Sequence, residues 1–271
     1  MYQSEKEFLE NYRVSDFKQL SMTSDLLIIS ISDEEKNDYR KNNGKKMSIL
    51  LVKREDYPYK DMWCLPGGFV NPDTETLEDC AKRVLKNETN ITNIYLEQLF
   101  TFDGIKRDPR CRVVTTAYIA LIDKNILKEP LLKNASWFDV IIYEEKDSIV
   151  NMTLSNGIDN IHFSIKKTLR PLSTDRYNFT ILENKDLAFD NPLVILSGIE
   201  RIRNKITYTD IVFNMMPEYF TLGELQKVYE VILGKKLLDP AFRRMIKNKV
   251  VKTNKIKNDG GHRPSWLFKK K

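Results

Sequence analysis

The pattern of apolar and polar positions places most of the predicted strands in the first two thirds of the chain. Two continuous apolar runs, residues 26–31 and 47–52, predict buried strands that form a hairpin around the charged loop 33–46. Residues 113–122 are nearly all apolar or threonine, so we expect this strand in the interior of the sheet. Further strands are expected at 94–101 and 140–143, and a hairpin turned at Asn156-Gly157 is expected between 152 and 165.

Helical spacing occurs once between these strands and then throughout the last third. A helix is predicted over residues 76–87, after a glycine turn at 65–68. A second helix over 190–205 begins near Pro192, and Thr221 with Glu224 forms a capping box for a third helix that Gly234 closes. The remaining predicted elements are a short helix at 209–215, a helix from 239 to about 248, and a hairpin of 250–256 and 265–268 turned at 258–261.

This order of elements predicts an α+β fold. We expect a mixed β-sheet flanked by helices over residues 1–205, followed by a small winged helix-turn-helix domain over residues 206–271. The first domain is expected to bind a ligand and the second to bind DNA. Residues 145–185 receive no predicted function.

Composition favours a cytoplasmic protein. The chain has 271 residues, and its sequence contains no apolar run long enough to cross a bilayer and no secretory signal at its start. Three cysteines are an odd number for a disulfide framework, and we expect Cys80 and Cys111 to be small buried side chains. With only two histidines, a Cys/His metal cluster is not expected.

Charge is concentrated at the C-terminal end. Residues 241–271 contain eleven Lys or Arg and one acidic residue, a net of +10, whereas the whole chain carries +6, which leaves −4 for residues 1–240. A basic segment on an acidic body is typical of proteins that bind a phosphate backbone. A solvated tail is the alternative, but Trp266, Leu267 and Phe268 are large apolar residues that such tails seldom contain.

The last helices and hairpin follow the order of a winged helix, in which the helix from Pro240 is the recognition helix. Its basic residues and those of the wing are expected to contact DNA phosphates. Use of the same module for protein contacts or dimerisation is the alternative. The candidate DNA-binding residues are Arg243, Arg244, Lys247, Lys249, Lys255, Lys257, His262 and Arg263.

Residues 65–91, LPGGFVNPDTETLEDCAKRVLKNETNI, resemble the signature of the Nudix family. The family places a glutamate on a loop and then Arg-Glu-x-x-x-Glu-Glu on a helix; here Glu75 and Arg83 align, with one extra loop residue. The three helix carboxylates fall on Val84, Asn87 and Glu88, so only one of them survives.

The missing carboxylates matter because three on one helix face hold the Mg²⁺ that activates water and neutralises a diphosphate. We therefore predict weak or absent pyrophosphohydrolase activity, with Glu75 and Glu88 as the residual catalytic candidates. No cofactor is expected, and Mg²⁺ at Glu88 would apply only to a working hydrolase. In the absence of metal chemistry, Arg83 is expected to hold the loop by pairing with Glu75 or Glu88.

A second basic cluster, KRDPRCR at residues 106–112, lies between two predicted strands and is expected beside the same cleft. It could receive a diphosphate or a sugar acid, whereas a solvated loop with an internal Arg–Asp pair is the alternative. Gly67 and Gly68 would line the ligand or serve only the turn. The candidate ligand-binding residues are Arg54, Gly67, Gly68, Arg83, Arg107, Asp108 and Arg110.

Three longer segments extend the resemblance to the NrtR type of Nudix-related transcriptional regulators: RDPRCRVVTTAY at 107–118, LAFDNPLVILSGIERIRNKITYT at 187–209 and FTLGELQKVYEVILGKKLLDPAFRRMI at 220–246. This resemblance implies a homodimeric repressor that binds duplex DNA and senses ADP-ribose. A related branch senses arabinose, so the effector stays open among ADP-ribose, another nucleotide and a sugar. The competing hypotheses are a Mg²⁺-dependent hydrolase of ADP-ribose or a similar compound, and a scaffold without ligand or DNA.

Overall fold

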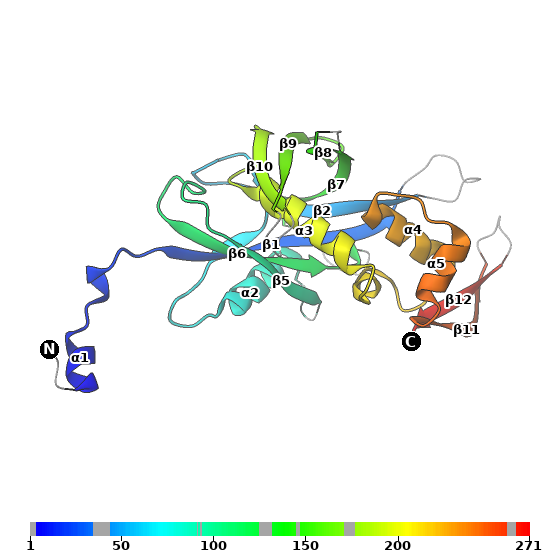
Figure 1. The fold of residues 1–271 in the computed structure, drawn as a ribbon, viewed down its shortest axis with the longest axis horizontal. Helices are drawn as coiled ribbons and strands as arrows, with labels where there is room; N and C mark the ends of the chain where they lie inside the picture. Colours follow the sequence, from blue (N-terminus) through cyan, green and yellow to red (C-terminus); the bar gives the residue numbers. More distant parts are fainter. Residues whose placement is uncertain are drawn as a thin grey trace.

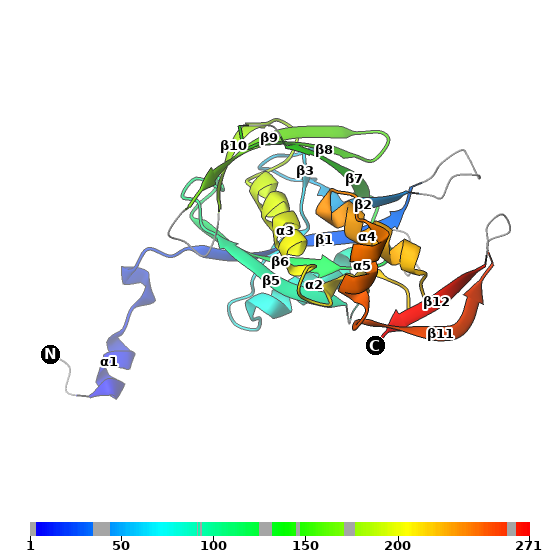
Figure 2. The same cartoon turned by 45° about the vertical axis from the view of Figure 1, so that its right-hand side comes forward.

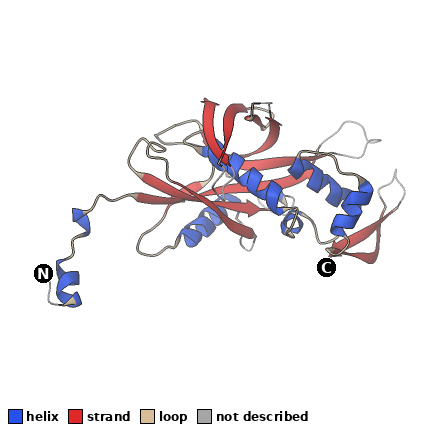
Figure 3. Cartoon of the chain, viewed as in Figure 1, coloured by secondary structure: helices blue, strands red, loops and turns tan. Residues whose placement is uncertain are grey.

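The computed structural model describes residues 4–34, 44–90, 92, 94–124, 132–144, 147–170, 177–258 and 264–271. Its helices and strands are distinguished in Figure 3. A sheet with helices on both faces forms the body, a small C-terminal module lies at one end, and an N-terminal arm projects from the opposite end (Figure 1).

In the described part of the chain, ten strands form one sheet in the order β10-β9-β8-β7-β2-β1-β6-β5, with β3 paired to β2 and β4 paired to β1. β1 runs parallel to β6 and antiparallel to β2 and β4, so the sheet is mixed. The strands are β1 Ser21–Asp33, β2 Lys45–Lys53, β3 Trp63–Cys64, β4 Gly67–Phe69, β5 Tyr95–Phe102, β6 Val113–Leu121, β7 Ala135–Glu144, β8 Ile149–Ser155, β9 Asn160–Leu169 and β10 Tyr177–Asn184.

Successive side chains of a strand point to opposite faces of the sheet, and both faces of β1 are buried. Leu26 and Ile28 pack into one apolar cluster beside helix α2 (Leu77–Thr89). Leu27 and Ile29 pack into the other cluster, beside helix α3 (Asn191–Lys205). The two helices therefore cover opposite faces, and the outer strands β8 to β10 curl around α3 (Figure 2).

The C-terminal module consists of a 3-10 helix, η3 (Ile211–Met215), helices α4 (Leu222–Leu233) and α5 (Asp239–Ile246), and the hairpin β11 (Val250–Lys257) with β12 (Ser265–Lys270). Thr221 and Glu224 cap α4 reciprocally, and Gly234 ends it at a φ of 66°. Tyr229 and Phe242 meet edge to face between the two helices. This arrangement is a winged helix.

One apolar cluster runs without interruption from the sheet through α3 into α4 and α5. Ile206, directly after α3, is completely buried within it. Arg203 of α3 also donates a hydrogen bond from Nε to the Ile232 carbonyl of α4 at 3.0 Å. The domain boundary between residues 205 and 206 stays a prediction. The body and the C-terminal module pack against each other at this point.

Most predicted elements are confirmed within one to five residues, including the Asn156-Gly157 hairpin and the interior position of β6. The pattern missed β3, β4, β10, helix α1 (Glu5–Asn11) and the 3-10 helix η1 (Val14–Asp16). Most of the predicted loop 33–46 and of the wing turn 258–261 lies outside the described residues.

Two predictions about individual residues are wrong. Gly67 and Gly68 lie on β4 rather than in a turn, and neither has a positive φ. A Cβ at Gly67 would overlap Asp25 Oδ1, so glycine allows a close approach between strands there. Cys111 is exposed, whereas Cys80 is buried as expected; all three cysteines are free thiols.

No helix in the described ranges combines the length and apolarity that a bilayer crossing requires.

Gly198 provides a test of the packing between α3 and the sheet. A Cβ at this position would overlap Leu27 Cδ2, and Leu27 is completely buried. We expect Gly198→Ala to lower the free energy of unfolding by about 1–3 kcal/mol through overpacking. Gly223→Ala is the matched control, because a Cβ there meets no atom within 4 Å. Urea denaturation measures both variants, and equal stability of Gly198→Ala and the parent would contradict this packing.

Candidate functional site

A cavity of about 340 Å³ opens where β1, β2, β4, the loop before β6 and the start of α3 converge. Six of the seven predicted ligand-binding residues line it, together with Glu88; Arg83 and Glu75 do not. The lining residues are Thr23, Asp25, Val52, Lys53, Arg54, Glu55, Asp56, Cys64, Leu65, Gly67, Gly68, Phe69, Glu88, Arg107, Asp108, Arg110, Val113, Asn134, Phe189 and Asn191.

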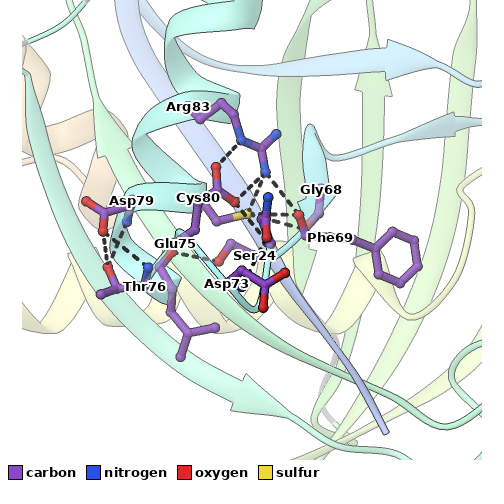
Figure 4. Close-up of polar contacts among 11 residues, drawn as sticks. Ser24, Gly68, Phe69, Asp73, Glu75, Thr76, Asp79, Cys80 and Arg83 are labelled. Carbon is purple, nitrogen blue, oxygen red and sulfur yellow. Dashed lines mark hydrogen bonds and ion pairs between the residues drawn. The ribbon is translucent and has the colours of Figure 1, made fainter.

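Glu75 and Arg83 bind each other rather than the cavity (Figure 4). The Arg83 guanidinium donates to both Glu75 carboxylate oxygens and to the Phe69 carbonyl, which fixes the loop between β4 and α2. The hydrogen bonds from Arg83, together with one from the Asn71 backbone, lower the pKa of Glu75 to about 2. The predicted pairing of Arg83 with a glutamate is confirmed, and its partner is Glu75.

The three former carboxylate positions of α2 have different surroundings. Val84 is buried in the apolar cluster under the sheet, and a Cβ at Gly68 would lie 3.2 Å from its Cγ2. Asn87 is exposed. Glu88 Oε2 is buried without a hydrogen-bond partner among the described residues, and burial raises the pKa of Glu88.

These surroundings do not fit a Nudix magnesium centre. Val84 has no donor atom, and one carboxylate cannot supply the face that the family uses. Within the described ranges, no group of three His, Cys, Asp or Glu side chains is placed to hold a metal ion. Glu88 instead offers a single hydrogen-bond acceptor, or a donor when protonated, to a ligand in the cavity.

Arg107 closes the floor of the cavity through a buried ion network. Its guanidinium donates to Asp190 Oδ1 and Oδ2 at 2.8 and 3.0 Å and to Asp25 Oδ2 at 3.2 Å. Its side chain is only 5% exposed. Burial raises the pKa of Asp25, although the Arg107 charge opposes that shift. Sequence patterns could not locate Asp25 and Asp190, because they lie 165 positions apart and meet only through the fold.

Arg110 and Arg54 each cover an aromatic ring at the cavity. Asp108 accepts two hydrogen bonds from the Arg110 side chain, which places the guanidinium carbon 5.2 Å from the Phe69 ring centre. The Arg54 guanidinium carbon lies 4.9 Å from the Phe189 ring centre. The predicted internal Arg–Asp pair is confirmed, but the loop is not fully solvated because Arg107 and Asp108 are buried.

The lining combines four basic residues with five acidic ones. The basic residues are Lys53, Arg54, Arg107 and Arg110, and the acidic residues are Asp25, Glu55, Asp56, Glu88 and Asp108. Such a surface does not favour a bare polyanion. It favours a ligand that presents hydroxyl donors, phosphate acceptors and a planar ring that can pack against an aromatic side chain.

The predicted DNA-binding residues of the winged helix differ in exposure and in whether an acidic residue binds them. Arg243, Arg244 and Lys247 are exposed on or directly after α5. Lys249 and Lys257 are instead tied to acidic residues. Lys249 Nζ lies 3.2 Å from Asp210 Oδ1, and Lys257 Nζ lies 2.7 Å from Glu224 Oε1.

The wing carries aromatic neighbours that the charge pattern did not indicate. Lys252 Nζ lies 3.7 Å from the Trp266 ring centre, and Lys255 Nζ lies 3.6 Å from that of Tyr219. Such contacts fix the lysine ammonium groups close to the module surface. The predicted residues His262 and Arg263 lie outside the described residues.

The ion pair of Glu75 predicts a measurable titration. Because the folded pKa of about 2 lies below the ordinary value of 4.5, the pair stabilises the folded loop above pH 4.5. That contribution is lost as the pH falls from 4.5 to 2. Carboxyl NMR should give a Glu75 midpoint near 2 in the parent and a higher one, shifted towards 4.5, in Arg83→Met, where the Asn71 hydrogen bond remains. A parent midpoint near 4.5 would exclude the pair.

Comparison with known proteins covers both parts of the chain. Residues 39–153 match the NUDIX domain, and residues 212–269 match the NrtR DNA-binding winged helix domain. The ADPR responsive transcriptional repressor NtrR of Acinetobacter baylyi is 32% identical over 272 residues, covering 99% of this chain and 89% of that protein.

Two crystal structures have the same architecture. The MutT/nudix family protein from Enterococcus faecalis has a TM-score of 0.70 and 25% identity, covering 99% of this chain and 94% of its own. Shewanella oneidensis NrtR in complex with a 27mer DNA has a TM-score of 0.64 and 25% identity, covering 92% and 93%. The predicted fold class is confirmed. The chain belongs to the family of NrtR-type transcriptional regulators, which join a NUDIX domain to an NrtR winged helix domain.

Proposed function

We propose that this protein is a DNA-binding transcriptional regulator whose cavity binds ADP-ribose, or a closely related nucleotide sugar, without hydrolysing it. The observation that carries the proposal is the contrast between helix α2, which has lost metal-binding carboxylates, and the cavity beside it. Val84 has become part of the apolar core, whereas the cavity beside it keeps Gly67, Gly68, Arg54 and Arg110. ADP-ribose is favoured over a simple sugar because the relative from Acinetobacter baylyi responds to ADPR. Its hydroxyls, phosphates and adenine also suit the mixed charges and aromatic rings of the cavity.

The DNA surface in this proposal is α5. Arg243, Arg244 and Lys247 are its exposed cations, and a helix of this kind lies in the major groove in winged-helix proteins. The NrtR structure with a bound 27mer DNA supports DNA as the partner. Lys249 and Lys257 act mainly within the module, because their ammonium groups hold Asp210 and Glu224.

Helix α3 supplies a physical connection between the two sites. At its N-terminal end, Phe189 and Asn191 line the cavity, and Asn191 Oδ1 accepts a hydrogen bond from the Leu65 amide at 2.8 Å. Near its C-terminal end, Arg203 bonds to the Ile232 carbonyl of α4. Fifteen helical residues span about 22 Å. A ligand that prefers one position of α3 would therefore bias the position of the winged helix.

The regulator is proposed to act as a homodimer. Winged-helix and related regulators commonly bind two half-sites with two recognition helices, and a two-fold dimer presents them in matching orientations. In that arrangement the effector acts by changing the relative placement of two copies of α5.

Charge reversal on α5 tests the DNA proposal. We expect Arg243→Glu with Arg244→Glu to weaken binding of a labelled mixed-sequence duplex at low salt. The slope of log affinity against log salt should fall in magnitude by about 2, because two phosphate contacts are lost. Lys86→Glu on α2 is the control and should bind normally. Fluorescence anisotropy measures both, and unchanged binding by the double variant would refute a recognition role for α5.

Ligand binding without turnover tests the cavity. At free ADP-ribose a hundred times its Kd, stability should rise by about 2.7 kcal/mol, which a thermal-shift assay detects as a higher Tm. Arg54→Met should weaken the response, whereas Lys86→Met should not. Chromatography after incubation with Mg²⁺ should recover intact ADP-ribose. Rapid Mg²⁺-dependent hydrolysis would restore the enzyme hypothesis, and the absence of any shift would exclude ADP-ribose as the ligand.

A further inference from the structure

The N-terminal arm, residues 4–20, has an unusual surface. It contains α1 and η1 and extends away from the sheet (Figures 1 and 2). No residue of α1 is buried. Five large apolar side chains of the arm are nevertheless exposed: Phe8 by 41%, Leu9 by 61%, Tyr12 by 46%, Phe17 by 56% and Leu20 by 50%.

The aromatic side chains of the arm lie next to one another and form one continuous surface. The Tyr12 ring lies between those of Phe8 and Phe17, with ring centres 5.5 and 5.6 Å apart. A helix of seven residues is marginal in water without tertiary packing. The arm therefore gains stability when its apolar side chains are covered, and contiguous apolar surface of this kind marks an interaction site.

A groove of complementary character lies on the body. It is a cavity of about 510 Å³ between α3 and the two edge strands of the sheet, β5 and β10, with β9 beside them. Its apolar walls include Phe100, Phe102, Phe179 and Leu193. Phe100 is 46% exposed there.

Charge favours the same pairing. The groove carries three basic residues, Lys167, Arg170 and Arg201, and one acidic residue, Glu200. Glu97 lies 3.6 Å from Arg201 as its ion-pair partner, so this group has a net of +1. The arm carries four acidic residues, Glu5, Glu7, Glu10 and Asp16, and three basic ones, Lys6, Arg13 and Lys18, a net of −1. Opposite potentials favour association and set the orientation of partners.

The arm and the part of the groove around Phe102 lie at the same end of the sheet. Ser21, where the arm joins β1, pairs with Val113 of β6, and Phe102 of the groove pairs with Thr115, two residues along β6. The winged helix lies at the opposite end (Figure 1). A two-fold axis at the arm end would let two copies exchange arms while both copies of α5 stay accessible.

We propose that the arm of one copy binds the groove between β5, β10 and α3 of a second copy, so that two identical contacts close a homodimer. The occupant is a second copy because every chain carries both complementary surfaces. The proposal rests on the dimer in the proposed function and names the surface that forms it. Helix α3 lines the groove as well as the first cavity, so the dimer contact and the effector site share one element.

Sedimentation velocity of the full chain tests the dimer. Leu9→Asp with Phe17→Asp should raise the dimer dissociation constant by about a hundredfold or more, because each dimer loses four buried apolar side chains. The Tm extrapolated to low protein concentration should stay at the parent value, because these side chains are exposed in the single copy. Tyr57→Asp, at an aromatic residue 81% exposed on the body, is the control and should stay dimeric. A double variant that dimerises as the parent does would overturn the proposal.

Cysteine cross-linking tests the identity of the groove. In a Cys111→Ser background, Leu9→Cys in a size-tagged copy should cross-link to Asn178→Cys in an untagged copy, because Asn178 lines the groove. Tyr57→Cys in place of Asn178→Cys should not react. Cross-linking within one copy, or a dimer that gives no cross-link, would overturn the proposal. ADP-ribose binding and DNA binding are measured on the same proteins, so a failure of the proposed function is seen separately from a failure of the arm contact.

Discussion

The arrangement of the molecule depends on the ion pairs that the Arg107 guanidinium forms with two aspartates. The guanidinium joins Asp25 of the central strand to Asp190, the residue before α3, and thereby fixes the start of that helix at the floor of the cavity. Since two partly buried carboxylates share this buried cation, loss of Arg107 would leave uncompensated negative charge at the cavity and destabilise the fold. The other end of α3 is bonded to α4, so the orientation of the winged helix depends on the same anchor.

The signature helix has become part of the structural framework beside this anchor. Val84 fills the apolar cluster, and the Glu75–Arg83 pair holds the loop that carries Phe69 towards the cavity. A carboxylate at position 84 would be buried among apolar side chains and unpaired, which is unfavourable without a metal ion. These residues fit the proposed cleft, which binds its ligand without the magnesium centre of a hydrolase. The aromatic–arginine pairs Phe69–Arg110 and Phe189–Arg54 form its walls.

Local patterns predicted the elements whose signals are themselves local. The capping box of α4, the Asn156-Gly157 hairpin and the apolar run of β1 each follow from neighbouring residues, and each is confirmed. The Glu75–Arg83 pair could be predicted because both residues belong to one short motif. The sequence could not indicate that Lys249 and Lys257 pair with Asp210 and Glu224, or that Gly67 stands against Asp25, because these partners meet only in the fold. Strand β10 was missed although Tyr177, Phe179 and Ile181 alternate with exposed residues; the alternation is short, and the pairing with β9 shifts register between Ile181 and Glu183.

The most direct test of a regulatory cleft measures whether ADP-ribose and DNA change each other's binding affinity. Anisotropy gives the DNA affinity with and without saturating ADP-ribose, and calorimetry gives the ADP-ribose affinity with and without the duplex. If α3 links the two sites, both affinities change, and they change by the same factor, as linkage requires. Two affinities that are each independent of the other ligand would contradict the account.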